Sequence, residues 1–311
     1  MKRRRSDRVL LYYKYISIEE PELYTERHLK FCKNLGLLGR ILIAPEGING
    51  TVAGTFEQTE AYMQAVKMDI RFSDIEFKID NVTEIPFKKM FVRHRDEIVT
   101  YGLMDDIDPN KLTGKKLKPK EFYEMLHKDD VVIIDGRNDY EYDLGHFEGA
   151  VRPTVNNAKE FQSWIRNDLG DLKDKTILTY CTGGIRCEKL SGLLVREGFK
   201  NVFQLNGGII NYSHDKEVKG KGFLGKCYVF DERISVDINQ TEEHTIVAKC
   251  FHCAKPCERY VNCARHECHV QIICCEECDK KFKRSCSIEC MNSERNVYNM
   301  EEKARASVIE G

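Results

Sequence analysis

The stretch Cys181-Thr-Gly-Gly-Ile-Arg186 decides the fold of the middle of this chain, because it joins a strand-like segment to a helix-like one. Residues 176–180 are β-branched, leucine or aromatic and predict a strand. After the loop, apolar residues recur at helical spacing until Gly198 and predict a helix. The loop therefore lies over a helix N-terminus, with a cysteine at its start and an arginine at its end.

The composition of this loop favours a thiolate at its first position. Gly183 and Gly184 let successive backbone N–H groups turn towards the thiol without steric cost. The helix start adds about half a positive charge and Arg186 adds a permanent one, so we expect a lowered pKa for the thiol. The predicted catalytic residues are Cys181 and Arg186, and the active-site loop between them comprises Thr182, Gly183, Gly184 and Ile185.

A simpler interpretation is that Cys181 is a small buried residue in a tight turn, which is the usual environment of an isolated cysteine. The rare composition of the loop favours the catalytic interpretation. Cys187, directly after Arg186, is either a resolving thiol or a packing residue of the first helical turn, and we favour packing.

Further segments extend the pattern around the loop. Upstream are Val131-Val-Ile-Ile-Asp-Gly-Arg137, Glu141-Tyr142 and Gly145-His-Phe-Glu-Gly-Ala150, and downstream is Leu205-Asn-Gly-Gly208. With the loop, they resemble the rhodanese (sulfurtransferase) domain over about residues 118–214. The resemblance implies a persulfide on Cys181, and supporting residues behind the loop at Asp135 and Arg137. Independently, the unbroken apolar run before Asp135 predicts a strand covered on both faces, and hence a parallel sheet flanked by helices.

The C-terminal part of the chain is rich in cysteine. Ten of the 14 cysteines fall between residues 250 and 290, in a segment too polar to build a large core. They include four close pairs, which fit two tetrahedral zinc sites of structural type. The predicted zinc ligands are Cys250, Cys253, Cys263, Cys268, Cys275, Cys278, Cys286 and Cys290. The pairing stays open at one or two positions, because there are surplus candidates: Cys257, Cys274, His252, His266 and His269.

A disulfide framework is the competing interpretation of these cysteines. Disulfides belong to oxidising compartments and normally accompany a secretory signal, whereas the apolar run at residues 9–13 is too short for a signal or a membrane span. We therefore favour zinc, which would also supply folding free energy to a small polar module. We expect a cytoplasmic protein with no membrane partner.

The first 110 residues predict a small α+β domain that is ferredoxin-like in the order of its elements. The net charge of the chain, −1, does not indicate a class of partner. The expected elements are a strand at 9–16, a helix at 22–35, a strand at 40–44, a turn at Asn49-Gly50, a strand at 51–53, a helix from Thr55 with Gln58 three residues on, and strands at 75–79 and 91–99.

Two segments of this domain have both a functional and a plain interpretation. The segment Leu42–Val52 clusters glycine and asparagine as a ligand-binding loop does, but Asn-Gly is also the strongest short signal for a hairpin, which we favour. Basic residues interleave with phenylalanine further on and can follow a phosphate backbone, although a solvated edge strand explains the same charges. The candidate phosphate-binding residues are Lys88, Lys89, Arg93 and Arg95.

The Leu42–Val52 motif, the loop and the cysteine-rich tail occur in this order in one family, the rhodanese-domain tRNA uridine 5-hydroxylases, which nearly the whole chain resembles. The segments that carry the resemblance are Tyr12–Ile16, Gly39–Val52, Asp135–Tyr142 and Cys181–Lys189. The sequence departs from the expected pattern at Gly136, where we expect a branched residue, and this bears on the rigidity of the loop. The expected domains are residues 1–110 (ferredoxin-like, tRNA-binding), 111–120 (basic linker), 121–220 (rhodanese), 221–300 (zinc module) and 301–311 (tail).

The resemblance implies oxygen-dependent hydroxylation of the wobble uridine of tRNA at C5, with the basic residues of the front domain on the anticodon arm, where an unstacked base is accessible. The sequence carries no flavin, haem or nicotinamide signature that would activate oxygen. One hypothesis is that the Cys181 thiolate or persulfide adds to C6 of uracil and makes C5 electron-rich. The other places a redox metal in the cysteine-rich tail, and we prefer the first.

Two other functions fit parts of the sequence. A plain sulfurtransferase would pass persulfide sulfur from thiosulfate or a sulfur donor protein to an acceptor, and the loop alone supports this. A non-enzymatic adaptor would bind RNA or protein and use the rhodanese fold as a scaffold. The presence of both Cys181 and Arg186 argues against the adaptor, since a scaffold does not need that pair.

Overall fold

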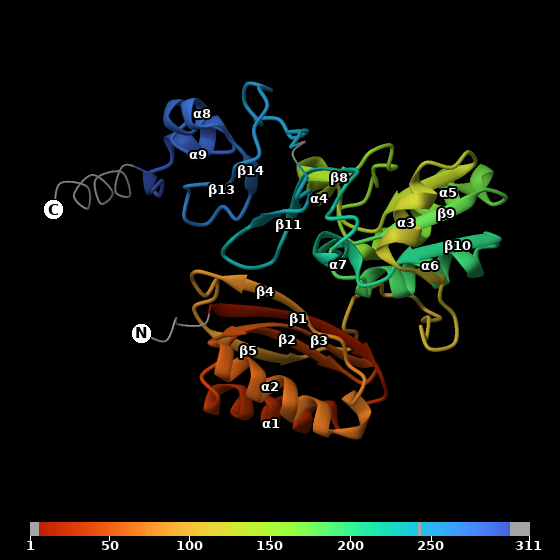
Figure 1. The fold of residues 1–311 in the computed structure, drawn as a ribbon. Coiled ribbons are helices and arrows are strands. Elements are labelled where there is room, and N and C mark those ends of the chain that lie inside the picture. Colours follow the sequence, from red (N-terminus) through yellow and green to blue (C-terminus); the bar gives the residue numbers. More distant parts are fainter. Residues whose placement is uncertain (1–5, 242–243, 299–311) are drawn as a thin grey trace.

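The computed structural model describes residues 6–241 and 244–298, and the expected tail at 301–311 lies outside them. The chain forms three parts in sequence order (Figure 1): a sheet with two helices on one face, a parallel sheet flanked by helices, and a small cysteine-rich module. The predicted combination of α+β and α/β domains with a cysteine-rich module is confirmed. No helix among the described residues is both long enough and apolar enough to cross a membrane.

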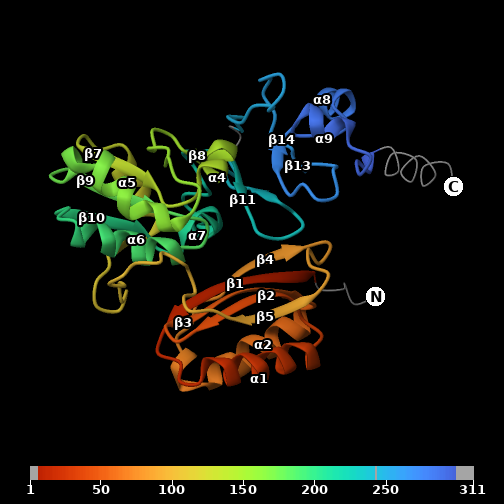
Figure 2. The same ribbon diagram turned by 180° about the vertical axis from the view of Figure 1, so that it is seen from behind.

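The first part is a five-stranded sheet in the order β4-β1-β3-β2-β5. Its elements are β1 (Asp7–Tyr15), α1 (Pro21–Asn34), β2 (Leu38–Ala44), β3 (Gly47–Gly54), α2 (Phe56–Met68), the 3₁₀ turn η1 (Ile70–Phe72), β4 (Lys78–Val82) and β5 (Met90–His94). The first four strands and two helices follow the predicted ferredoxin-like order, and β5 adds itself parallel to β2. Both helices cover the same face of the sheet (Figures 1 and 2), so the other face is free to meet the rest of the chain.

The hairpin between β2 and β3 is confirmed, but the predicted turn at Asn49-Gly50 is wrong. The register pairs Ala44 with Gly47, so Pro45-Glu46 forms the turn and Asn49-Gly50 lies inside β3. A side chain at Gly50 would come within 2.3 Å of the Tyr12 hydroxyl, so this glycine makes room for an aromatic ring rather than for a turn. The expected capping box of Thr55 and Gln58 is present at the start of α2.

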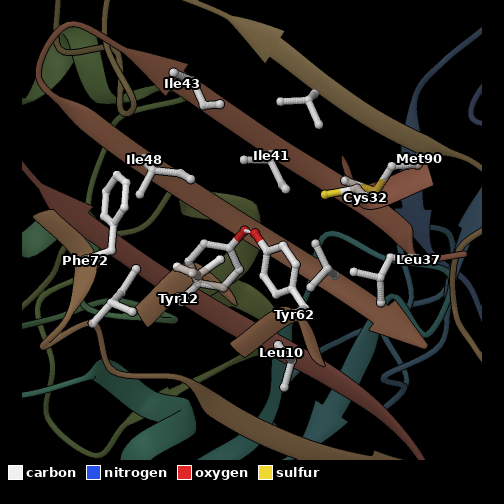
Figure 3. Close-up of a cluster of buried hydrophobic side chains, with 14 of the residues drawn as sticks. Leu10, Tyr12, Cys32, Leu37, Ile41, Ile43, Ile48, Tyr62, Phe72 and Met90 are labelled. Atoms are coloured by element: carbon white, nitrogen blue, oxygen red, sulfur yellow. Dashed lines mark hydrogen bonds between the residues drawn. The ribbon is translucent and has the colours of Figure 1, made fainter. Parts of the chain in front are cut away.

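The core between the sheet and its two helices is mostly apolar and contains a chain of polar contacts (Figure 3). Tyr12 of β1 and Tyr62 of α2 point their hydroxyl groups at each other. Nε2 of His28, on α1, lies 2.8 Å from the Tyr62 hydroxyl. Burial lowers the pKa of His28 to about 4, so the imidazole is neutral near pH 7. The three side chains tie both helices to the sheet, because each would be costly to leave unpaired in this core.

The second part is a four-stranded parallel sheet in the order β6-β10-β9-β7. Apolar clusters fill both of its faces, with α3 and α7 on one and α5 and α6 on the other, as the unbroken apolar run predicts. The elements are β6 (Lys115–Leu117), α3 (Pro119–Leu126), β7 (Val131–Asp135), α4 (Asp139–Leu144), β8 (Gly145–Phe147), η2 (Ala158–Glu160), α5 (Phe161–Asp168), η3 (Gly170–Leu172), β9 (Thr176–Tyr180), α6 (Ile185–Arg196), β10 (Asn201–Leu205) and α7 (Gly208–His214).

The segment 111–120, expected to be a basic linker, is part of this sheet. Residues Lys115–Leu117 form the edge strand β6, which pairs with β10, and α3 begins at Pro119. An edge strand tolerates lysine because one of its sides faces water, which is why its composition resembles that of a linker.

The third part begins as an extension of the second. β11 (Phe223–Tyr228) pairs with β8 and with β12 (Ser235–Asp237). The cysteine-rich module follows, with β13 (Tyr260–Asn262), β14 (Gln271–Ile273), α8 (Glu276–Lys281) and α9 (Ile288–Asn292). The segment expected as a zinc module at 221–300 therefore starts with two strands that belong to a small sheet with β8.

One buried lysine holds the first part against the second. The Lys189 side chain, on α6, is fully buried, and its ammonium lies 2.8 Å from Glu46, 2.9 Å from Glu97 and 2.8 Å from Asp106. Glu46 belongs to the turn between β2 and β3, and the other two carboxylates lie between β5 and β6. Lys189 thus connects the helix that follows the Cys181 loop to two segments from the front of the chain.

We predict that Lys189→Ala destabilises the protein by about 2 kcal/mol, because it leaves three carboxylates uncompensated; the cost is less than for a fully buried ion pair, since these carboxylates are partly exposed to water. Urea denaturation, followed by tyrosine fluorescence and circular dichroism, measures this change. The matched control is Lys200→Ala, since Lys200 is exposed and pairs with an exposed Asp174; its cost should stay below about 1 kcal/mol. Equal losses in the two variants would contradict the central role of Lys189.

Candidate active site and metal-binding cysteines

The Cys181 loop runs from the end of β9 to the start of α6, as predicted. Gly184 caps the helix with φ 98°, a conformation that favours glycine, and its N–H donates to Sγ of Cys181 at 3.2 Å. On the other side of the loop, α7 donates N–H groups to the carbonyls of Cys181 and Thr182. A side chain at Gly208 would lie 2.5 Å from the Cys181 carbonyl oxygen, so the downstream Gly-Gly pair is needed for this close approach.

The pKa of Cys181 is lowered, as the loop composition predicts. Burial alone would raise it, but a hydrogen bond from the Cys187 thiol, the charge of Arg186 and the N–H groups of Cys187 and Gly184 lower it to about 6. Burial raises the pKa of Cys187, so this thiol stays protonated and donates a hydrogen bond to the Cys181 thiolate. Cys187 is buried as expected, and it also stabilises the thiolate.

Arg186 is held by an acid that the sequence analysis missed as a site residue. Its guanidinium forms two bonds to Glu141, of 2.6 and 2.9 Å, and a third to Oγ1 of Thr182 at 3.2 Å. Burial alone would raise the pKa of Glu141, but the charge of Arg186 lowers it, so the pair is ionic. The sequence signal for Glu141 is its position three residues after Asn138, where it caps α4.

Asp135 and Arg137 lie behind the loop, where the resemblance places them. Both are fully buried and form a bidentate ion pair, and Arg137 also donates to the carbonyl of Gly145 at 2.6 Å. Tyr180 donates to Asp135 at 2.6 Å, which links the end of β9 to β7. A side chain at Gly136 would lie 2.9 Å from Leu190, so glycine fits the packing of α6 at this position.

The uncovered face of the first sheet lies opposite the loop. Side chains alternate along a strand, so Tyr12 points into the helix-covered core while Tyr13 points to the other side. The same alternation puts Arg40 of β2 beside Phe91 of β5, since the two residues are partners in the parallel register. Basic and aromatic side chains therefore share one face.

A cavity of about 570 Å³ lies between this face and the loop. The loop supplies Thr182, Gly183, Ile185 and Arg186 to its wall. Phe230, which follows β11, lies beside Arg186 of the loop and also lines the cavity. The front of the chain supplies arginines, aromatic rings and neutral polar groups: Arg40, Arg93, Arg95, Tyr13, Phe87, Phe91, Asn49, Thr51 and Thr100. No acidic residue of the described chain lines the cavity, so it suits an anionic ligand with a planar group.

Cys181 itself is fully buried below this wall. A side chain at Gly183 would lie 3.0 Å from Leu11, so the loop and the first strand are closely packed above the sulfur. A ligand in the cavity therefore reaches Cys181 only when the loop or Leu11 shifts, or when the sulfur is extended by a second atom.

The four basic candidates fall into two groups. Arg93 and Arg95 line the cavity, whereas Lys88 and Lys89 are exposed outside it, and Lys88 pairs with Glu232 at 2.9 Å. The sequence analysis missed Arg40, which lies in the Gly39–Val52 motif. Its signal is its spacing in β2, where it alternates with buried isoleucines.

Three tyrosines from the front of the chain hold the start of α6. Tyr13 donates to Glu188 at 2.9 Å, Tyr15 to the carbonyl of Ile185 at 3.4 Å, and Tyr101 to the carbonyl of Arg186 at 3.0 Å. Two of them belong to the Tyr12–Ile16 segment that carries part of the family resemblance, so this segment positions the loop across the domain boundary.

The eight predicted metal ligands come together in two tetrads. One consists of Cys250, Cys253, Cys275 and Cys278, and the other of Cys263, Cys268, Cys286 and Cys290, with the ligand atoms of each tetrad within 4.8 Å of one another. The first close pair thus joins the third, and the second joins the fourth. The sequence left this grouping of the close pairs open. Outside both tetrads lie the surplus candidates Cys257, Cys274, His252, His266 and His269.

We predict that the rate of Cys181 alkylation rises with pH and is half-maximal near pH 6 in the native protein. The rate should stay high above that pH and fall below it, because the thiolate is the nucleophile. In the unfolded protein the midpoint should be that of an ordinary thiol. Iodoacetamide pulses, followed by mass spectrometry of the Cys181 peptide, give the profile separately from those of the other cysteines.

In Cys187→Ala the midpoint should move to higher pH by about one unit, because a hydrogen bond to a charged group is worth roughly 1.5–3 kcal/mol. Cys32→Ala is the matched control, since Cys32 is buried in the core of the first domain, far along the chain from the loop. An unchanged midpoint in Cys187→Ala would show that Cys187 only packs.

Comparison with known proteins matches each part of the chain to a domain family. Residues 8–98 match the UPF0176 acylphosphatase like domain, residues 118–215 the rhodanese-like domain, and residues 224–291 the rhodanase C-terminal domain. The first two matches agree with the ferredoxin-like order of the front sheet and with the helix-flanked parallel sheet around Cys181.

Curated relatives match nearly the whole chain. Proteins named tRNA uridine(34) hydroxylase from Bacillus licheniformis, Bacillus velezensis and Bacillus pumilus are 60%, 59% and 58% identical to it. Each match spans 291 residues, which is 94% of this chain and 90% of the relative. With this identity over this length, the chain belongs to the tRNA uridine(34) hydroxylase family.

Proposed function

We propose that this protein hydroxylates C5 of the wobble uridine of tRNA in the cytoplasm, with molecular oxygen as co-substrate and Cys181 as the active-site thiolate or persulfide. The names of its relatives give the reaction class. The observation that carries the proposal is the cavity between the Cys181 loop and the uncovered face of the front sheet, since one wall carries arginines and aromatic rings.

The cavity suits one nucleotide of a single-stranded loop. Arg40, Arg93 and Arg95 form no ion pair within residues 6–241 and 244–298, so their charges are available for phosphates. Phe91 and Phe230 are exposed aromatic side chains on which a base can stack. On this proposal the anticodon arm lies along the front domain, and the wobble base enters between it and the loop.

The thiolate of Cys181 provides a nucleophile beside this cavity. In the proposed step Sγ bonds to C6 of uracil, the C5–C6 π electrons move towards C5 and O4, and the electron-rich C5 attacks molecular oxygen to form a C5–O bond. Two donor thiols then supply two electrons and two protons and become a disulfide; the O–O bond breaks, one oxygen atom stays on C5 as hydroxyl and the other leaves as water. Loss of the sulfur from C6 and of the proton from C5 restores the double bond and the Cys181 thiolate. A persulfide also lengthens Cys181 by one sulfur, which shortens the distance from its buried position to the base.

Nucleoside mass spectrometry of tRNA tests the proposal. A Bacillus strain without its own tRNA uridine(34) hydroxylase would carry this protein, its Cys181→Ser variant or an empty vector. We expect 5-hydroxyuridine-derived nucleosides only with the wild-type protein, because serine at neutral pH is a far weaker nucleophile than a thiolate. Immunoblots should confirm equal amounts of the two proteins.

Full hydroxylation by Cys181→Ser would reject the role of this cysteine. The sulfurtransferase alternative remains supported by the thiolate-stabilising loop, and the same experiment separates it. If 5-hydroxyuridine derivatives are independent of the protein while thiolated nucleosides depend on it, then sulfur transfer from thiosulfate or a sulfur donor protein is the function.

We further propose that the two cysteine tetrads bind structural zinc. The tetrads are able to bind metal, since each brings four thiol ligands close together. Four thiolates suit zinc and complete its tetrahedral shell, which leaves no position for oxygen and disfavours a redox role. Burial alone would raise the pKa of Cys250, but backbone N–H groups, first that of Cys275, lower it to about 6. The Ser287 hydroxyl lowers the pKa of Cys290 to about 7, whereas burial raises the pKa of Cys278 and Cys286. Zinc would supply the folding free energy of the module.

Metal analysis of the purified protein should find two zinc ions per chain. Cys253→Ser in the first tetrad and Cys268→Ser in the second should each lower the content to about one, because a structural zinc site needs all four ligands. The matched control is Cys257→Ser, which lies in the same module outside both tetrads and should keep two ions. Loss of zinc from the control alone would reject the assignment of ligands.

A further inference from the structure

Among the described residues that line the cavity, Asn49 is the one with a carboxamide side chain. Asn49 lies in β3, where it pairs with Tyr13 of β1 and with Leu42 of β2. These neighbours also line the cavity, so Asn49 projects from the middle of the uncovered face. The side chain is half-buried, so its hydrogen bonds are stronger than those of an amide fully exposed to water.

The orientation of the Asn49 amide is set by the backbone. Its Nδ2 lies 3.3 Å from the carbonyl oxygen of Ile98, and because a carbonyl only accepts hydrogen bonds, the amino group must face it. The N–H of Ile98 in turn donates to Glu46 at 2.7 Å, and Glu46 belongs to the Lys189 cluster. Within the described part of the chain, Oδ1 of Asn49 forms no hydrogen bond, so this acceptor and the second N–H remain for a ligand.

Asn49 also shares the cavity with the Cys181 loop. Asn49 and the loop residues Thr182, Gly183, Ile185 and Arg186 line the same cavity, and Ile98, which holds the amide, packs in one apolar cluster with Ile185 of the loop. In a uracil ring, the C5–C6 edge and the N3 edge are on opposite sides. When the ring lies between the loop and Asn49 with its C5–C6 edge towards the loop, its N3 edge is towards Asn49.

At this edge uracil and cytosine have opposite hydrogen-bonding patterns. Uracil donates from N3–H and accepts at O4, whereas cytosine accepts at N3 and donates from its 4-amino group. An amide with its oxygen opposite N3 and its N–H opposite position 4 forms two hydrogen bonds with uracil. Cytosine would need the amide flipped, and a flipped amide would turn its oxygen towards the carbonyl oxygen of Ile98 and lose that hydrogen bond. We infer that Asn49 is the specificity-determining residue that reads N3–H of the target uracil, an inference that rests on the proposed tRNA hydroxylase function.

Binding of anticodon stem-loop RNAs tests this inference directly. Fluorescence anisotropy would compare RNAs with uridine, cytidine or N3-methyluridine at position 34, and mass spectrometry would measure hydroxylation of the uridine RNA. The wild-type protein should bind the uridine RNA about tenfold or more tightly than the other two, because a site built for a hydrogen bond rejects a ligand without the donor. Asn49→Ala should bind all three within about twofold of one another.

Asn81→Ala is the matched control, since Asn81 is an exposed asparagine on β4 that does not line the cavity. It should keep the preference of the wild type. The N3-methyluridine comparison needs no variant, so equal binding of uridine and N3-methyluridine RNAs by the wild type would overturn the inference even if Asn49→Ala did not fold.

The outcomes also separate this inference from the proposed function. If the wild type hydroxylates uridine RNA while Asn49→Ala keeps full discrimination against N3-methyluridine, then the assignment of Asn49 is wrong and the hydroxylase stands. If the wild type neither binds nor modifies the uridine RNA, then both fail.

Discussion

The buried contact of Lys189 with three carboxylates is the interaction on which the rest of the structure depends. Its ammonium joins α6 to Glu46 in the β2–β3 turn and to Glu97 and Asp106 in the segment after β5. Because α6 also begins with the Cys181 loop, the cluster fixes the distance between that loop and the front sheet. The cavity lies in the space that this contact helps to set, and the contact reaches the Asn49 amide through Glu46 and Ile98.

A thiolate that is buried needs compensation, and the structure supplies it locally. Donors from Gly184 and Cys187 together with the charge of Arg186 outweigh the cost of burial at Cys181. Arg186 can remain charged inside the protein because its ion pair with Glu141 offsets the cost of burial and holds the guanidinium in place. The same arrangement keeps Cys181 away from solvent, which protects it from unwanted oxidation while making access dependent on a shift of the loop.

The front sheet serves two purposes with its two faces. One face packs against α1 and α2 around the contact of Tyr12 with Tyr62, and the other carries arginines and aromatic rings towards the loop. A strand period of two allows this division, since neighbouring residues such as Tyr12 and Tyr13 point to opposite sides. The hydroxyls of Tyr13 and Tyr15 then reach across to α6, so the segment that builds the core of one domain also orients the active loop of the next.

The sequence alone determined the local chemistry and the class of fold: the ferredoxin-like order, the helix-flanked parallel sheet, the lowered pKa of Cys181 and the eight cysteines of the two tetrads. These follow from periodicity, loop composition and short spacings, which act over a few residues. Only the tertiary structure decided which cysteine pairs share a tetrad, that Glu141 holds Arg186, and that Arg40 and Asn49 face the loop while Lys88 and Lys89 do not. It also placed the β2–β3 turn at Pro45-Glu46 rather than at Asn49-Gly50. The physical reason is that these features depend on contacts between segments far apart in the chain, and burial and charge pairing at such contacts leave no local pattern in the sequence.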